Sequence, residues 1–284
     1  MIPTAFDYEA PETVEDAVRL LAEGGDDVKV LAGGQSLIPV LKLRLAGPEL
    51  IVDLGRIDGL RGIREDADDL VIGAMTPHHE VASSGLVREH AALLAEAAST
   101  VADPQVRHRG TFGGALVHAD PAGDLPAPAL ALGASFEIAG PGGTRTVPAA
   151  EFFVDLFTTA VGEDEILTAV RVPKHTGWGA AYEKFVRVSQ QWSIVAVAAT
   201  VRLDGSSIAE VRLGLTNMGS TPVRPEAAEQ ALIGVSPVAE AVEAAVAGVA
   251  DGTTPPEDLN GTADYRRHLA RVLARRAVLR AAGA

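Results

Sequence analysis

The apolar and polar positions near the start of the chain predict alternating helices and strands. Thr13 and Asp16 form a capping pair, the apolar residues from position 14 share one helical face, and Gly24 with Gly25 ends the helix. Short apolar runs predict strands at residues 28–32, 49–54 and 70–74. This pattern is typical of a small mixed α/β unit.

The middle of the chain predicts a helix, a glycine-rich turn and a hairpin. An alanine- and leucine-rich stretch from Val87 to Ala102 predicts one helix, which Pro104 separates from a turn at residues 103–114. Residues 135–149 predict a hairpin that turns at a Pro-Gly-Gly sequence, and residues 165–173 predict a strand.

After residue 173 the pattern changes to three strands joined by short turns, followed by helices. A chain of 284 residues is long for a single core, so we predict a domain boundary near residues 173–177. The predicted units are a first domain of residues 1–175, its subdomains of about 1–58 and 59–175, and a second domain of residues 176–284.

The last predicted helix is rich in arginine. A DNA-binding helix is one interpretation. Because Leu269, Val272, Leu273 and Ala277 share one face, we instead expect that face to pack inward and the arginines to form a solvated face. The arginines concerned are at positions 266, 267, 271, 275, 276 and 280.

Composition and charge narrow the class of protein. The chain is 47% hydrophobic and 22% charged, as in folded soluble proteins, and no apolar run reaches the length of a membrane-spanning helix. The first residues lack the basic and apolar regions of a signal peptide, so we expect none. We therefore expect a cytoplasmic protein, with peripheral attachment to the inner face of the membrane left open. The net charge of −14 disfavours nucleic acid as a partner. The absence of cysteine excludes disulfides, thiolate zinc sites and cysteine-bound iron–sulfur clusters in this chain.

Two glycine turns carry the candidate chemistry. They are Ala32–Ser36, directly after a predicted strand, and Thr111–Gly114. Consecutive amides in such turns can face one anion, bare Cα atoms let a ligand approach closely, and each turn carries a hydroxyl. Two turns could hold the two phosphates of a dinucleotide, although neither fits the Rossmann or P-loop fingerprint.

These motifs resemble those of the FAD-binding medium subunits of the molybdenum hydroxylases, the carbon monoxide and xanthine dehydrogenase family. The resemblance rests on the order and spacing of several stretches along nearly the whole chain. They read FDYEAPETVEDAVRLLAE, VLAGGQSLIPVLKLRLAGPELIVDLGRI, VADPQVRHRGTFGGALVHADPAGDLPAPALALGA, EILTAVRVP, YEKFVRV and YRRHLARVLARRA. The resemblance implies an α+β fold of the vanillyl-alcohol-oxidase type. In that fold FAD lies between two α/β subdomains, and a small C-terminal domain, a three-stranded sheet plus helices, covers the flavin.

The resemblance also implies cofactor-binding residues. The pyrophosphate would receive amides and hydroxyls from both turns. Asp124 matches an aspartate that hydrogen-bonds FAD hydroxyls. Leu167 matches a residue that contacts the cofactor through its backbone. Lys184 matches a lysine that stabilises negative charge at N1 of reduced flavin. The implied set is Ala32, Gly33, Gly34, Gln35, Ser36, Val101, Ala102, Thr111, Gly113, Gly114, Asp124, Leu167, Lys184 and Trp192.

Other features of the sequence leave an alternative open or argue against a role. Trp192 falls where one branch of the family places an aromatic residue beside the flavin ring, and an ordinary buried aromatic is the equal alternative. Gln35 stands where some relatives carry histidine. His78, His79 and Glu80 suggest a metal site, but adjacent residues do not share a helix face, so we predict none. No catalytic acid–base residue of this chain is predicted.

The leading interpretation is an FAD-carrying electron-transfer subunit. The expected partners are a large subunit with the molybdenum cofactor and a small subunit with iron–sulfur clusters, arranged as a dimer of heterotrimers, together with an external electron acceptor. The alternatives are a free-standing flavin oxidoreductase of the same fold and a non-catalytic binding or scaffold protein.

Overall fold

The N-terminal part of the chain is a parallel three-stranded sheet with helices packed beside it. The computed structural model describes residues 2–284. The sheet order is β1-β3-β2, and α1 begins after Thr13, whose hydroxyl accepts a hydrogen bond from the Asp16 amide at 3.1 Å. This confirms the predicted cap and strands. The elements are β1 Asp7–Glu9, α1 Val14–Gly24, β2 Val28–Leu31, α2 Leu37–Lys42 and β3 Leu50–Asp53, with 3-10 turns at Gly25–Asp27, Leu54–Arg56 and Asp58–Leu60.

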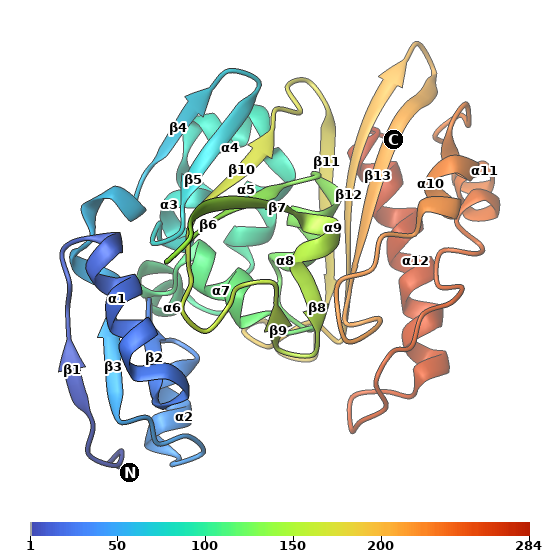
Figure 1. Ribbon diagram of the computed structural model, residues 1–284. Coiled ribbons are helices and arrows are strands. Elements are labelled where there is room, and N and C mark those ends of the chain that lie inside the picture. The colour runs from blue at the N-terminus through green and yellow to red at the C-terminus, as the bar shows by residue number, and fades with distance from the viewer. Residues whose placement is uncertain (1) are drawn as a thin grey trace.

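The middle of the chain folds around an antiparallel five-stranded sheet. Its order is β4-β5-β10-β6-β7, and the predicted hairpin is the β6–β7 pair. Helices α3 to α9 pack around it (Figure 1). The strands are β4 Ile63–Asp66, β5 Asp69–Gly73, β6 Ser135–Gly140, β7 Gly143–Pro148 and β10 Ile166–Pro173, with a small separate pair of β8 Phe153–Asp155 and β9 Thr158–Thr159.

Short helices replace two predicted features of this region. The single helix predicted from Val87 to Ala102 is wrong, because Ala91 leaves helical geometry and divides it. The predicted turn at 103–114 contains all of α6 and the start of α7. Pro104 is compatible with α6 because it occupies the first helical turn, where its missing amide costs nothing. The helices are α3 His78–Ser83, α4 Gly85–His90, α5 Ala92–Ser99, α6 Pro104–Arg109, α7 Phe112–His118, α8 Pro126–Ala131 and α9 Ala149–Phe152.

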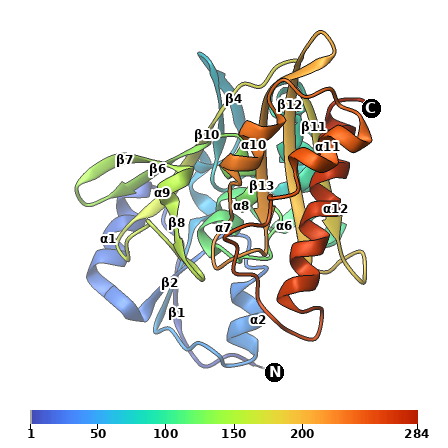
Figure 2. The ribbon, with the colours of Figure 1, turned by 90° about the vertical axis from the view of Figure 1, so that its right-hand side faces the viewer.

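The C-terminal part is an antiparallel sheet, β11-β12-β13, covered by helices on one face. Figures 1 and 2 show α12 running along the outer face, with α10 and α11 beside it. This confirms the predicted three strands followed by helices. The elements are β11 Gly179–Phe185, β12 Val195–Asp204, β13 Ser207–Thr216, α10 Glu226–Leu232, α11 Ala239–Ala245 and α12 Ala263–Ala281.

Strand β12 is buried on both faces. Val195, Val197 and Ala199 pack with the C-terminal helices, whereas Ala196 and Ala198 belong to the core of the preceding five-stranded unit. Because successive side chains point to opposite faces, one strand joins two cores.

The arginines of α12 do not form one solvated face. Leu269, Leu273 and Ala277 are buried as predicted, but Arg266 is also fully buried. Its guanidinium donates to the Ile194 carbonyl at 2.5 Å and to Asp258 at 2.7 Å. The prediction for Arg266 was therefore wrong. The Ile194 carbonyl and the Asp258 carboxylate bind two of its guanidinium nitrogens, while its buried Nε has no hydrogen-bond partner within residues 2–284.

Candidate functional site

The two glycine turns lie against each other, although one follows strand β2 and the other lies between α6 and α7. At Gly33 a Cβ atom would overlap the Arg109 carbonyl oxygen and lie 2.7 Å from the Gly110 Cα. At Gly114 a Cβ atom would lie 2.6 Å from the Thr111 hydroxyl oxygen and 3.3 Å from the Ala32 Cβ. Only a residue without a side chain fits such a close approach of two backbones.

The first turn connects β2 to α2, and its hydroxyl makes no capping bond to that helix. Gly34 has φ +74°, which favours glycine, and its carbonyl accepts from the Ile38 amide at 3.0 Å. Gln35 donates to the Gly33 carbonyl at 3.1 Å, so its side chain closes its own turn. Ser36 stands at the N-cap of α2 without a side-chain capping bond. Its hydroxyl remains available to a ligand.

The second turn uses its own amides more fully than the sequence indicates. The Phe112 amide donates to the Thr76 carbonyl and the Gly113 amide to the Ala74 carbonyl, both at 2.8 Å. The Thr111 oxygen caps α7 by accepting from the Gly114 amide at 3.2 Å. We therefore revise the expected role of Gly113: its amide is bonded to Ala74, and its missing side chain lets the turn pack against that residue, because a Cβ atom would lie 2.7 Å from the Ala74 Cα.

A cavity of about 350 Å³ opens where the two turns meet. Every predicted residue of both turns lines it, and Leu167 of β10 joins them. Val117, His118 and Val161 continue its wall, and His78 lies at the second turn. Bare glycine surfaces, a free hydroxyl and mostly apolar walls fit a pyrophosphate with an organic group on either side.

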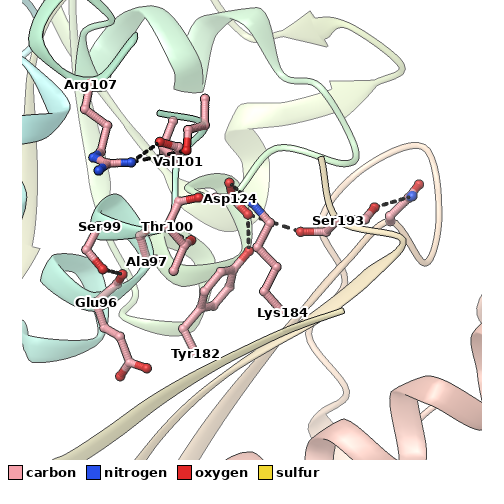
Figure 3. Close-up of polar contacts among 12 residues, drawn as sticks. Glu96, Ala97, Ser99, Thr100, Val101, Arg107, Asp124, Tyr182, Lys184 and Ser193 are labelled. Atoms are coloured by element: carbon pink, nitrogen blue, oxygen red, sulfur yellow. Dashed lines mark hydrogen bonds and ion pairs between the residues drawn. The ribbon is translucent and has the colours of Figure 1, made fainter. Parts of the chain in front are cut away.

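The other predicted residues do not line this cavity. Asp124 and Lys184 meet in a separate buried cluster, in which the ammonium lies 2.7 Å from the carboxylate (Figure 3). The Tyr182 hydroxyl donates to Asp124 at 2.9 Å and the Ser193 hydroxyl donates at 3.1 Å. All three partners follow residue 173, whereas Asp124 precedes it, so the cluster joins the two parts of the chain.

Burial dominates the electrostatics of this cluster. It raises the pKa of Asp124, while the Lys184 cation and the hydroxyl donors act in the opposite direction. Burial and the neighbouring carboxylate raise the pKa of Tyr182 well above its usual value, so its hydroxyl stays a neutral donor. An ionised carboxylate offers about four acceptor positions, and three are filled here. One position remains for a ligand hydroxyl.

Val101 and Ala102 form a tight bend beside this cluster. Ala102 has φ +39°, an uncommon conformation for alanine, and Arg107 holds the bend by donating to the Val101 carbonyl at 2.8 Å and the Ala102 carbonyl at 3.2 Å. Lys184 donates to the Thr100 carbonyl at 3.2 Å from the other side (Figure 3). The bend is thus fixed between two cations.

Sequence reasoning missed several members of the site. Tyr182 stands two residues before Lys184 in β11, and the two-residue period of a strand could have placed both on one face. Ser193 and Arg107 carry no such local signal. His78 and His79, adjacent at the start of α3, point to different environments, as expected for neighbouring helix residues. His78 is buried, while His79 is exposed and stacks on His108 with ring centroids 4.0 Å apart.

Trp192 is not a core residue. Its side chain is 68% exposed, so the interpretation as an ordinary buried aromatic is wrong. It directly precedes Ser193, which is bound to Asp124. Stacking on the flavin stays a prediction.

Comparisons with known proteins agree with this geometry. Residues 4–175 match the family described as FAD binding domain in molybdopterin dehydrogenase, and residues 180–281 match the CO dehydrogenase flavoprotein C-terminal domain. The carbon monoxide dehydrogenase medium chain of Hydrogenophaga pseudoflava is 45% identical over 281 residues, covering 98% of this chain and 97% of the relative. The corresponding chain of Afipia carboxidovorans is 42% identical, with coverage of 99% and 98%.

A solved structure shows the same fold. Carbon monoxide dehydrogenase from Hydrogenophaga pseudoflava, in a form that lacks the Mo-pyranopterin moiety of its cofactor, matches with a TM-score of 0.96 at 46% identity. The match covers 99% of this chain and 98% of that chain. It confirms the predicted fold class.

Fold and matched domains together define an FAD-dependent oxidoreductase flavoprotein. The chain belongs to the family of FAD-binding medium subunits of the molybdenum hydroxylases, which are multi-subunit enzymes. The comparisons favour this interpretation over a free-standing oxidoreductase or a scaffold protein. Among residues 2–284, no helix combines the length and apolar character needed to cross a membrane.

Proposed function

We propose that this chain takes electrons from iron–sulfur clusters on a small subunit and delivers them through FAD to an external acceptor. Substrate oxidation would occur at a molybdenum cofactor on a large subunit, and the complex would be a cytoplasmic dimer of heterotrimers. The observation that carries the proposal is the cavity formed where two glycine turns touch. The chain has no cysteine with which to bind a cluster of its own.

The two turns would hold the pyrophosphate of FAD. The Ser36 hydroxyl and the absence of side chains at Gly33, Gly34 and Gly114 support this placement, and Leu167 contributes an apolar part of the cavity wall. FAD supplies the capacity to accept a pair of electrons and release them to another acceptor. The chain itself binds, orients and shields this group.

The Asp124 cluster would fix the flavin end. Lys184 keeps one ammonium proton beyond its bonds to Asp124 and Thr100, and this donor can stabilise negative charge on reduced flavin. Asp124 has one free acceptor position, and Trp192 is exposed and free to stack. We place the domain boundary near residue 175. The two family matches, to residues 4–175 and 180–281, support this position.

Absorption spectroscopy and native mass spectrometry test this proposal. The chain mixed with FAD and passed through a desalting column should retain the two visible flavin absorption bands. Purification from its native host should yield complexes that contain a larger and a smaller chain, and added substrate should bleach the flavin bands. A chain that retains no flavin, or that purifies alone and turns over a substrate without partner subunits, would contradict the proposal.

A further inference from the structure

His78 borders the cavity at the second glycine turn. It is the first residue of α3, its side chain is 4% exposed, and its amide donates to the Gly110 carbonyl at 3.0 Å. A Cβ atom on Gly110 would lie 2.9 Å from Cδ2 and 3.0 Å from Nε2 of the imidazole. That edge of the ring therefore faces the turn.

Burial sets the charge of the His78 ring, and its hydrogen bonding indicates which nitrogen carries the proton. Burial, with a smaller effect of Arg107, lowers the pKa of His78 to about 4, so the imidazole is neutral at pH 7. Its Nδ1 is buried and has no hydrogen-bond partner within residues 2–284. A buried acceptor without a partner is more common than a buried N–H without one, which places the proton on Nε2.

The second turn needs such a donor. The amides of Phe112, Gly113 and Gly114 are already bonded within the chain, so they leave few donors for an anion on this side of the cavity. A neutral N–H adds a hydrogen bond without burying a second charge near Arg107.

We infer that His78 is a further cofactor-binding residue, which donates its Nε2–H to a pyrophosphate oxygen of FAD. The inference rests on the proposed placement of the pyrophosphate. It assigns a polar role to a residue whose sequence neighbours suggested a metal ligand.

Substitutions that keep or move the donor test the inference. Glutamine carries its amide nitrogen near the place of Nε2, whereas asparagine carries it near the place of Nδ1. In fluorescence titrations of the full-length apoprotein, H78F and H78N should weaken FAD binding at least 10-fold, as expected when a hydrogen bond to a charged group is lost. H78Q should stay within about threefold of the wild type. The exposed neighbour supplies the control, H79F, which should change nothing.

ADP, which presents the diphosphate without the flavin, is the second probe. H78F should weaken ADP binding by the same factor as FAD binding, and thermal melting should show that the variants are folded. In 15N spectra of the wild type, FAD should shift the protonated Nε2 resonance. Equal FAD affinity of H78F and wild type, or rescue by H78N in place of H78Q, would overturn the inference. The proposed function would then still be judged by whether G114V loses FAD.

Discussion

The cavity between the glycine turns and the Asp124 cluster are built in opposite ways. The cavity is made of backbone and missing side chains, and the Ser36 hydroxyl and the Nε2 edge of His78 lie beside it. In the cluster, Asp124 already receives three protein donors. The cavity thus offers polar groups that a ligand can bind, whereas most hydrogen-bonding positions of the cluster are already filled by the protein. The cluster also joins the two parts of the chain. Substitutions should therefore affect ligand binding at the first region and folding at the second.

Removing Asp124 should produce the largest effect. D124A leaves the buried ammonium of Lys184 without its counter-charge, which should lower the free energy of unfolding by about 3–5 kcal/mol. Urea denaturation of the apoprotein measures this loss. D204N, at an exposed hairpin position, is the control. A loss below about 1 kcal/mol would show that the cluster does not hold the two parts together.

Filling the cavity should affect binding more than folding. G114V places a side chain against the Thr111 hydroxyl and the Ala32 Cβ, and we expect FAD affinity to fall at least about 100-fold, equivalent to about 2.7 kcal/mol. Flavin fluorescence titration measures the affinity. G142V is the matched control, because nothing lies within 4 Å of a Cβ at that exposed turn. Unchanged flavin content in G114V would remove this turn from the site.

Lowering the pH should reduce the stability of the folded protein through the buried imidazole of His78. The pKa of His78 is about 4 when folded and near 6.5 when unfolded, so its contribution to stability is fully present above pH 6.5 and is lost as pH falls toward 4. Between pH 7 and pH 5 the apoprotein should lose about 2 kcal/mol from this group. Urea denaturation at both values, with H78F as the comparison, isolates this contribution. Equal pH dependence of the two proteins would contradict it.

The smallest effect on folding is expected at Trp192. W192A should change the free energy of unfolding by less than about 0.5 kcal/mol, since the side chain is 68% exposed. If the indole stacks on the flavin, the same substitution should shift the visible flavin absorption and increase flavin fluorescence. An unchanged flavin spectrum would remove Trp192 from the site.

Local signals predicted the features that depend on neighbours in sequence. The cap at Thr13, the strands before and after the first turn and the β6–β7 hairpin follow from short patterns. The short helices α6 and α7 were missed because proline and glycine usually break helices, and here they occupy first-turn positions instead.

Long-range contacts could not be predicted in this way. The burial of Arg266 depends on loops near residues 194 and 258. The Gly113 amide is bonded because the Ala74 carbonyl lies beside it. The resemblance supplied candidate cofactor residues, but not the fact that Asp124 is held by Tyr182 and Ser193. Such partners become visible only when distant segments are placed in space.

The double burial of β12 limits how this part of the sequence can change over time. A one-residue insertion in the strand would exchange its two faces and move the side chains of both cores at once. Length variation among homologues should therefore collect in the exposed connection at residues 204–207 and avoid the strand. The strand should change by paired, volume-conserving replacements. The sequences of the FAD-binding part and the C-terminal part are therefore expected to change together where they pack against β12.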